Sequence, residues 1–219
     1  MNFAAIFDWD GVIIDSSVQH ERSWELLSAE IGKPLPEGHF KRGFGKKNEA
    51  IIPDLGWANE PAEIHAIGLR KEELYRELIV RDGVTPLPGA RELLEALEQA
   101  GVPCAVGSST HRKNIEAIFG ITGLRRFFKA VVTGEDVVHG KPAPDVFLAA
   151  ADRLGAEPQS CVVFEDALVG IAAAHAGGMK CVAVATTNPI ELLGEAEASV
   201  QSLTEVSLSK LAALFGKVG

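Results

Sequence analysis

The chain has 219 residues, of which 47% are hydrophobic, so it is long and apolar enough to bury a substantial core without disulfides. Its formal net charge of −9, from 21 basic and 30 acidic residues, argues against a general nucleic-acid binder or a membrane-surface binder. The three cysteines form no CxxC pair, and the sequence has neither a signal-peptide pattern nor a run of about 18 apolar residues. We therefore expect a cytoplasmic protein with free thiols and no nucleic-acid or membrane partner.

The first predicted element is a buried strand, and a helical segment follows it. Residues 3–7 are apolar without interruption, as in a strand that is covered on both faces. Helical patterns without intervening apolar strands are found at residues 17–31, 47–53 and 61–80. The stretch 82–89 contains two prolines and two glycines and suits a hinge. We predict a small helical domain over residues 16–85.

The sequence after the hinge alternates short apolar strands with helical patterns. The predicted strands are 102–107, 130–133, 161–164 and 180–185, and the predicted helices are 112–119, 145–154 and 167–176. This alternation is typical of a parallel sheet with helices on both faces. Together with the strand at 3–7, it predicts a doubly wound α/β core that consists of residues 1–15 and 86–219.

Two aspartates follow the first strand. Asp8 and Asp10 would point the same way in a continuing strand, and Gly11 favours a turn that crowds both carboxylates at the strand's carboxyl end. Carboxylates that lie so close repel each other unless a cation or a shared proton intervenes, and Mg²⁺ prefers oxygen ligands. One aspartate could then attack phosphorus while the other handles a proton. A solvated acidic turn explains this motif equally well when it is taken alone.

Two further strand ends carry groups that suit a phosphate. Ser108 and Ser109 lie between a predicted strand and a predicted helix, where hydroxyls and free backbone N–H groups can bind phosphoryl oxygens. The plainer alternative for these serines is helix capping. Lys141 lies in the sequence GKPAPD, whose prolines make the backbone rigid. Its ammonium would then be fixed beside the carboxylates, whereas an exposed lysine is the ordinary alternative.

A second acidic pair follows the predicted strand 161–164. Glu165 and Asp166 would supply the remaining ligands of a metal, because the carboxyl ends of parallel strands meet at one edge of the sheet. Taken alone, Asp166 could instead stabilise the first turn of the next helix. Capping does not explain several acids that converge on one edge, so we expect a divalent-cation site.

The four motifs, in this order and with a helical insertion after the first, resemble those of the haloacid dehalogenase-like superfamily of phosphotransferases. The nearer likeness is to the β-phosphoglucomutase-like subfamily. The resemblance covers essentially the whole chain. It implies a Rossmann-like core with an inserted α-helical cap domain, and Mg²⁺ as the cofactor.

The resemblance also implies roles for the residues of the motifs. Asp8 matches the nucleophile that forms a phosphoaspartyl intermediate, and Asp10 matches the general acid and base. The matches to groups at the metal are Asp8, the backbone carbonyl of Asp10, Asp166 as a direct ligand, and Glu165 either as a ligand or as a group behind the ligands. The matches to groups that bind the transferring phosphoryl are Ser108, Lys141 and the backbone N–H of Ser109.

Three residues of the helical segment match substrate-binding positions of the mutases. His20 matches a histidine that couples substrate binding to cap closure, and Lys71 falls near a cap lysine. Lys46 ends the stretch Gly43-Phe44-Gly45-Lys46, which resembles a loop that grips the distal phosphate. The mutases have an arginine there, so Lys46 could pair with phosphate without the bidentate fork. Histidines and lysines on helices are mostly solvated, which is the alternative for His20 and Lys71.

We expect Mg²⁺-dependent phosphoryl transfer from a small phosphorylated metabolite, with a sugar phosphate as the first choice. If water accepts the phosphoryl group, the protein is a phosphomonoester hydrolase, which we prefer because it demands less of the cap. If another hydroxyl of the same sugar phosphate accepts it, the protein is an intramolecular mutase. A non-catalytic phosphate-binding regulatory module is the third alternative, and Asp10 argues against it because a pure binder needs no general acid. We expect a monomer, because the cap must move freely.

Overall fold

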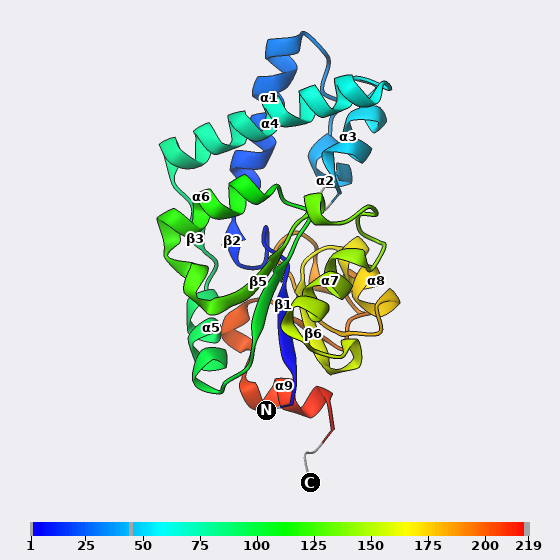
Figure 1. Cartoon of the computed structure of the whole chain (residues 1–219). Helices are drawn as coiled ribbons and strands as arrows, with labels where there is room; N and C mark the ends of the chain where they lie inside the picture. Colours follow the sequence, from blue (N-terminus) through cyan, green and yellow to red (C-terminus); the bar gives the residue numbers. More distant parts are fainter. Residues whose placement is uncertain (1, 44–45, 217–219) are drawn as a thin grey trace.

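A parallel sheet forms the centre of the structure, with helices on both faces (Figure 1). The computed structural model describes residues 2–43 and 46–216. Six strands form the sheet in the order β5-β4-β1-β6-β7-β8, and every neighbouring pair is parallel. Their bounds are Ala4–Phe7 (β1), Cys104–Gly107 (β4), Phe128–Val132 (β5), Cys161–Glu165 (β6), Lys180–Val184 (β7) and Ala198–Val200 (β8). Five of these strands confirm the sequence prediction, and β8 was not predicted.

The two faces of the sheet are covered by different helices. Side chains of α5 (Ala90–Gln99), α6 (Arg112–Thr122) and α9 (Leu208–Leu214) belong to the apolar cluster on one face. Those of α7 (Asp145–Leu154) and α8 (Leu168–Ala176) belong to the cluster on the other. Strand β1 contributes Ala5 and Phe7 to the first cluster and Ala4 and Ile6 to the second. Burial on both faces explains its unbroken apolar sequence and confirms the doubly wound core.

Short 3₁₀ helices connect several of these elements. Their bounds are Leu124–Phe127 (η1), Gly134–Asp136 (η2), Pro158–Ser160 (η3), Ile190–Leu192 (η4) and Leu203–Glu205 (η5). Within residues 2–43 and 46–216, no helix has the length and apolar character that crossing a membrane requires.

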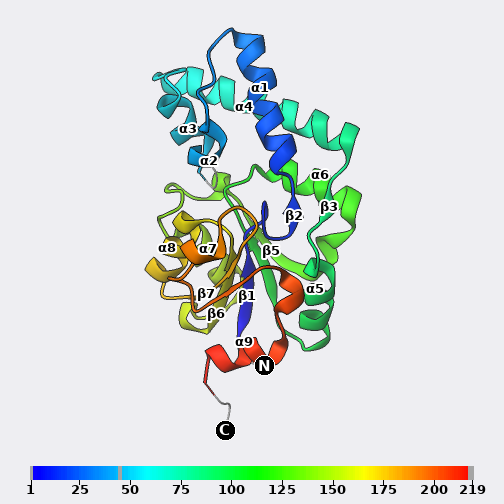
Figure 2. The same cartoon turned by 180° about the vertical axis from the view of Figure 1, so that it is seen from behind.

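Helices from the described residues between 17 and 82 form the cap at one end of the core (Figures 1 and 2). They are α1 (Ser17–Ile31), α2 (His39–Gly43), α3 (Asn48–Asp54) and α4 (Pro61–Asp82), and they surround an apolar cluster of their own that includes Trp24, Leu27 and Trp57. Helices α1, α3 and α4 were predicted, with α4 two residues longer than expected, and α2 was not. The boundary of the cap domain at residues 16–85 stays a proposal.

A two-stranded antiparallel ribbon connects the core to the cap. Its strands β2 (Ile14–Asp15) and β3 (Thr85–Pro86) pair Ile14 with Pro86 and Asp15 with Thr85. The predicted hinge over 82–89 therefore contains a paired strand, which ties the outgoing and returning chain together. In both views β1 runs toward the cap, so the carboxyl ends of the parallel strands face the cap helices.

Candidate active site

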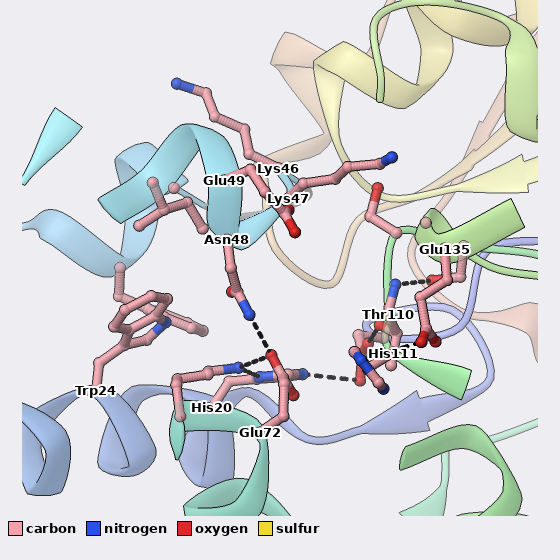
Figure 3. A pocket seen from close by; sticks show the side chains of 18 of the residues that line it. His20, Trp24, Lys46, Lys47, Asn48, Glu49, Glu72, Thr110, His111 and Glu135 are labelled. Atoms are coloured by element: carbon pink, nitrogen blue, oxygen red, sulfur yellow. Dashed lines mark hydrogen bonds and ion pairs between the residues drawn. The ribbon is translucent and has the colours of Figure 1, made fainter. Parts of the chain in front are cut away.

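A cavity lies between the carboxyl ends of the core strands and the cap (Figure 3). The core residues that line it are Asp8, Asp10, Ser108, Ser109, Thr110, His111, Gly134 and Glu135. The cap residues that line it are His20, Trp24, His39, Phe40, Gly43, Lys46, Lys47, Asn48, Glu49, Ile51, Lys71 and Glu72. Ser108, Ser109, His20, Lys46 and Lys71 were predicted to bind substrate and are in this lining, whereas Lys141 is not. The stretch Gly43–Lys46 also contains Phe44 and Gly45, which lie outside the described residues.

Three buried carboxylates from two strand ends meet beside one lysine. Asp8, Glu165 and Asp166 each offer an oxygen, and these oxygens lie within 4.8 Å of one another. The Lys141 Nζ lies 3.0 Å from Asp8 Oδ1 and forms a short ion pair with Glu165. The lysine is itself buried and follows the sequence prediction in lying beside the acids rather than on the surface. One ammonium thus faces three carboxylates.

The excess of acid perturbs the pKa values of this cluster. Burial raises the pKa of Asp8 to about 7, with Lys141 opposing the shift and Glu165 adding to it. Burial also raises the pKa of Asp166 well above its usual range, and the charges of Glu165 and Asp8 add to this. Burial would lower the pKa of Lys141, but the charges of Asp8 and Glu165 outweigh it and raise that pKa. The cluster needs a further positive charge to hold all its carboxylates ionised.

The oxygens that remain open fit a divalent cation. Asp166 Oδ1 is buried and has no hydrogen-bond partner in the described part of the chain. Asp8 Oδ1 is also buried and has no hydrogen-bond partner in the described residues, although the Lys141 Nζ lies 3.0 Å away. In contrast, Glu165 Oε1 pairs with Lys141, and Oε2 accepts the backbone N–H groups of Asp166 and Ala167, both at 2.8 Å. An all-carboxylate set with two open oxygens suits Mg²⁺.

The carboxylate of Asp10 has different partners from those of Asp8. The hydroxyls of Ser16 and Thr110 donate short hydrogen bonds to it, and His20 Nε2 lies 3.3 Å from its Oδ1. Burial alone would raise the pKa of Asp10, but His20 and the two hydroxyls outweigh burial and hold that pKa well below its usual range. Asp10 is therefore ionised in this arrangement, at the cap side of the cavity.

The loop after β4 places hydroxyl and backbone groups at the cavity floor. The Ser108 backbone N–H donates to the Val132 carbonyl at 3.0 Å, and the Ser108 side chain acts to lower the pKa of Asp8. The Thr110 N–H donates to Ser108 Oγ at 3.2 Å. These bonds fix the loop on the sheet and leave Ser108 and Ser109 in the lining of the cavity.

The predicted cap residues differ in how they meet the site. Lys71 is only 2% exposed, and its Nζ lies 2.7 Å from His20 Nδ1, so the solvated alternative is wrong for this lysine. His20 also stacks on Tyr75, with the ring centroids 3.9 Å apart. Lys46 Nζ lies 3.4 Å from Asp54, on the cap itself. Thus His20 and Lys71 connect to Asp10, whereas Lys46 does not.

Several residues of the site escaped the sequence analysis. Lys47 reaches from the cap to donate to the Val137 carbonyl at 2.8 Å, and Figure 3 shows it pointing away from Lys46. Glu72 accepts the Asn48 amide at 2.7 Å, and Thr187 donates to Asp166. The one available signal for Thr187 is its place in a polar stretch just after β7, at another strand's carboxyl end.

The family model of haloacid dehalogenase-like hydrolases matches residues 4–178 of the chain. The chain belongs to this family. It is therefore an enzyme of the haloacid dehalogenase-like group, as the four motifs indicated. The crystal structure of a haloacid dehalogenase hydrolase from Entamoeba histolytica agrees with the fold, with a TM-score of 0.88, 26% identity, and coverage of 98% of this chain and 100% of that one.

Relatives of the chain in this family include phosphatases and a phosphomutase. It is 40% identical to the chloroplastic 5-amino-6-(5-phospho-D-ribitylamino)uracil phosphatase of Arabidopsis thaliana over 94% of this chain, and spans only 56% of that protein's length. It is 36% identical to the fructose-1-phosphate phosphatase YqaB of Escherichia coli, over 82% of this chain and 94% of that protein. It is 33% identical to the β-phosphoglucomutase of Mycobacterium tuberculosis, over 82% of this chain and 79% of that protein. These relatives confirm the resemblance to the β-phosphoglucomutase-like subfamily.

Proposed function

We propose that the protein is a Mg²⁺-dependent phosphomonoester phosphatase that acts through phospho-Asp8 on a small, polyhydroxylated phosphate ester. The observation that carries this proposal is the pair of open carboxylate oxygens on Asp8 and Asp166 beside the buried Lys141, under a cavity roofed by the cap. The substrate class is supported by the two phosphatase relatives, whose names specify a phosphorylated ribityl compound and a fructose phosphate.

Asp8, Asp166 and the backbone carbonyl of Asp10 would hold the Mg²⁺. Glu165 would not contact the Mg²⁺ directly in our proposal, because its oxygens already pair with Lys141 and with two backbone N–H groups. When bound, Mg²⁺ supplies positive charge that offsets the phosphoryl oxygens and keeps Asp8 ionised. Gly170 makes room for Glu165, since a Cβ there would lie 1.9 Å from its carboxyl group.

The reaction proceeds in two displacements at phosphorus. Asp8 attacks, the bond from phosphorus to the ester oxygen breaks, and Asp10 gives its proton to the leaving alkoxide. Lys141 and Ser108 hold the phosphoryl oxygens during the transfer. Water then attacks phospho-Asp8 while Asp10 takes a proton from it, which releases inorganic phosphate, frees the Asp8 carboxylate and returns Asp10 to its protonated form.

The contacts of Asp10 set a requirement on the first displacement. The lowered pKa of Asp10 favours its ionised form, which is the form that accepts a proton from water in the second displacement. To act as an acid it must first bind a proton, so its contacts with Ser16, Thr110 and His20 must loosen when substrate enters. The cap carries His20 and therefore takes part in this change.

An intramolecular sugar-phosphate mutase is the second candidate. Two observations favour the mutase. The chain is 33% identical in sequence to a β-phosphoglucomutase, and a chain of contacts leads from Lys71 through His20 to Asp10. We prefer the phosphatase because Lys46, the cap residue matched to a distal-phosphate ligand, pairs with Asp54 instead.

Phosphate release from a panel of sugar and polyol phosphates, with Mg²⁺, tests the proposal. We expect wild-type protein to release phosphate and the Asp8→Asn variant to release none. The variant should melt at a temperature close to that of wild type, which would show that it is folded. Turnover retained by Asp8→Asn would refute the nucleophile. Isomer conversion that depends on a sugar bisphosphate, with little phosphate released, would instead identify the mutase.

A further inference from the structure

The segment that follows β7 contacts both of the loops that carry the proposed metal ligands. The Thr186 hydroxyl donates a hydrogen bond to the Gly11 carbonyl, next to Asp10. The Thr187 hydroxyl donates a short hydrogen bond to Asp166 Oδ2. The Asn188 side-chain amide donates to the Asp166 backbone carbonyl at 3.0 Å. Three consecutive polar residues thus connect the ends of β1 and β6 from a third strand.

These contacts leave Asp166 with one defined open oxygen. The residue is fully buried, and the Thr187 hydroxyl donates a short hydrogen bond to its Oδ2, with the Thr186 hydroxyl 3.4 Å from the same oxygen. Oδ1 has no hydrogen-bond partner within residues 2–43 and 46–216. Gly11 packs against the same carboxylate, since a Cβ there would lie 1.9 Å from Oδ2 and 3.2 Å from the Thr187 hydroxyl. The carboxylate is therefore held at Oδ2 by a hydroxyl donor, while Oδ1 is buried and open within the described residues, in a residue that belongs to the acidic cluster.

We propose that Thr187 is a positioning residue that fixes Asp166 Oδ1 toward the divalent cation. The inference rests on the proposed function, because it takes Asp166 as a ligand. A carboxylate whose second oxygen is held by a hydroxyl donor loses less rotational freedom on binding a cation, so the site is pre-organised. Outer groups of this kind commonly change metal affinity by about 10- to 100-fold.

Two substitutions separate the hydrogen bond from simple packing. Thr187→Val keeps the shape of the side chain and removes the hydroxyl, whereas Thr187→Ser keeps the hydroxyl and removes a methyl group. Thr122→Val is the matched control, because the Thr122 hydroxyl donates to the Ile118 carbonyl on α6 at 2.8 Å, away from the acidic cluster. Melting curves recorded in chelator would show that all three variants fold.

Mn²⁺ alone serves as the probe, and the free ion is counted by its electron paramagnetic resonance signal in substrate-free protein. We expect Thr187→Val to raise the Mn²⁺ dissociation constant about 10-fold, and Thr187→Ser and Thr122→Val to stay within about threefold of wild type. We also expect the activity lost by Thr187→Val to return at high Mg²⁺, because the defect lies in affinity.

Wild-type Mn²⁺ affinity in Thr187→Val would overturn the inference, and so would equal losses in the valine and serine variants. Asp166→Asn distinguishes this failure from failure of the proposed function. If Asp166→Asn weakens Mn²⁺ binding while Thr187→Val does not, only the role of Thr187 is refuted. If Asp166→Asn binds Mn²⁺ like wild type, the ligand assignment fails, and the role of Thr187 fails with it.

Discussion

At the scale of single residues, two glycines show how tightly the acidic loops are packed. Gly11 has φ of 79°, and a Cβ there would lie 1.9 Å from Asp166 Oδ2. Gly170 lies in α8, and a Cβ there would also lie 1.9 Å from the Glu165 carboxyl group. Neither position can take a side chain unless a carboxylate of the cluster moves.

Gly11→Ala should therefore damage both stability and activity. We expect it to lower the free energy of unfolding by more than the roughly 1–2 kcal/mol that left-handed backbone costs an L-residue, and to reduce kcat strongly because Asp166 is displaced. Gly155→Ala is the matched control, since Gly155 has φ of 66° and nothing within 4 Å of the added Cβ. Urea unfolding and kinetics measured at several Mg²⁺ concentrations check both variants. Unchanged kcat in Gly11→Ala would contradict the close approach.

Sequence patterns could predict those site residues that lie at strand ends. Asp8, Ser108 and Asp166 follow apolar strands, and parallel strands bring their carboxyl ends together, so local sequence is enough to place them. Lys46 and Lys47 have the same residue type and are adjacent, so local sequence could not show that Lys47 alone reaches the core. Such contacts depend on how the cap helices sit over the sheet.

At the scale of elements, α4 connects the cap to the core through one buried carboxylate. Glu72 on α4 accepts hydrogen bonds from Asn48 on α3 and from Asn114 on α6 of the core, and pairs with Lys71 at 3.1 Å. Arg76, one turn further along α4, donates to the Asn114 side chain at 2.9 Å. Since Lys71 contacts His20, the packing of α4 on α6 also positions the residues around Asp10.

Glu72→Gln should change how the free energy of unfolding depends on pH, and this change measures the contribution of the Glu72 carboxylate. Burial would raise the pKa of Glu72, but Lys71, His20 and the two amides outweigh burial and lower it to about 2. A group whose pKa is lower in the folded state stabilises the fold when the pH is above its pKa in the unfolded chain, which is 4.5 for Glu72. This contribution is lost as the pH falls toward 2. We expect the free energy of unfolding of wild type to exceed that of Glu72→Gln by about 3 kcal/mol near neutral pH. This difference should shrink as the pH falls below about 4.5.

Urea unfolding at a series of pH values measures this gap. Glu73→Gln is the control, because Glu73 is the next residue of α4 and pairs with Arg70 at the surface, where an ion pair contributes at most about 1 kcal/mol. A gap for Glu72→Gln that stays constant between neutral pH and pH 3 would show that the Glu72 charge does not stabilise the fold.

Sequence analysis missed several short elements and one longer helix, α5, which has ten residues. Strands β2 and β3 have two residues each, and α2 has five, so none of them is long enough to display a periodic pattern. The paired ribbon of β2 and β3 forms only because both ends of the cap return to the same place on the core. Helices α1, α4 and α7 and the buried core strands were predictable because their patterns reflect the layers that they pack into.

At the scale of the whole molecule, the acidic cluster makes stability depend on pH and on metal. The chain carries a net charge of −9, and among the described residues Lys141 is the one cation that pairs with the three carboxylates at the carboxyl ends of β1 and β6. Asp8 and Asp166 have raised pKa values, so the metal-free fold binds protons that the unfolded chain releases. A bound divalent cation would replace those protons.

We therefore expect the metal-free protein to lose stability as the pH rises. The contribution of Asp8 is complete below its unfolded pKa of 3.8 and disappears as the pH passes through about 7. Between about pH 5 and pH 8 this loss should be on the order of 2–4 kcal/mol, and saturating Mg²⁺ should stabilise the protein more at pH 8 than at pH 5. Asp10 and Glu72 have lowered pKa values and lose their contributions to stability only in more acidic solution. They therefore do not affect the change in stability between pH 5 and pH 8. Urea unfolding in chelator and in Mg²⁺ tests the expectation. In chelator, Asp8→Asn should make the free energy of unfolding depend less on pH than it does in wild type. If Mg²⁺ stabilised the protein equally at pH 5 and pH 8, the cluster would hold no exchangeable protons.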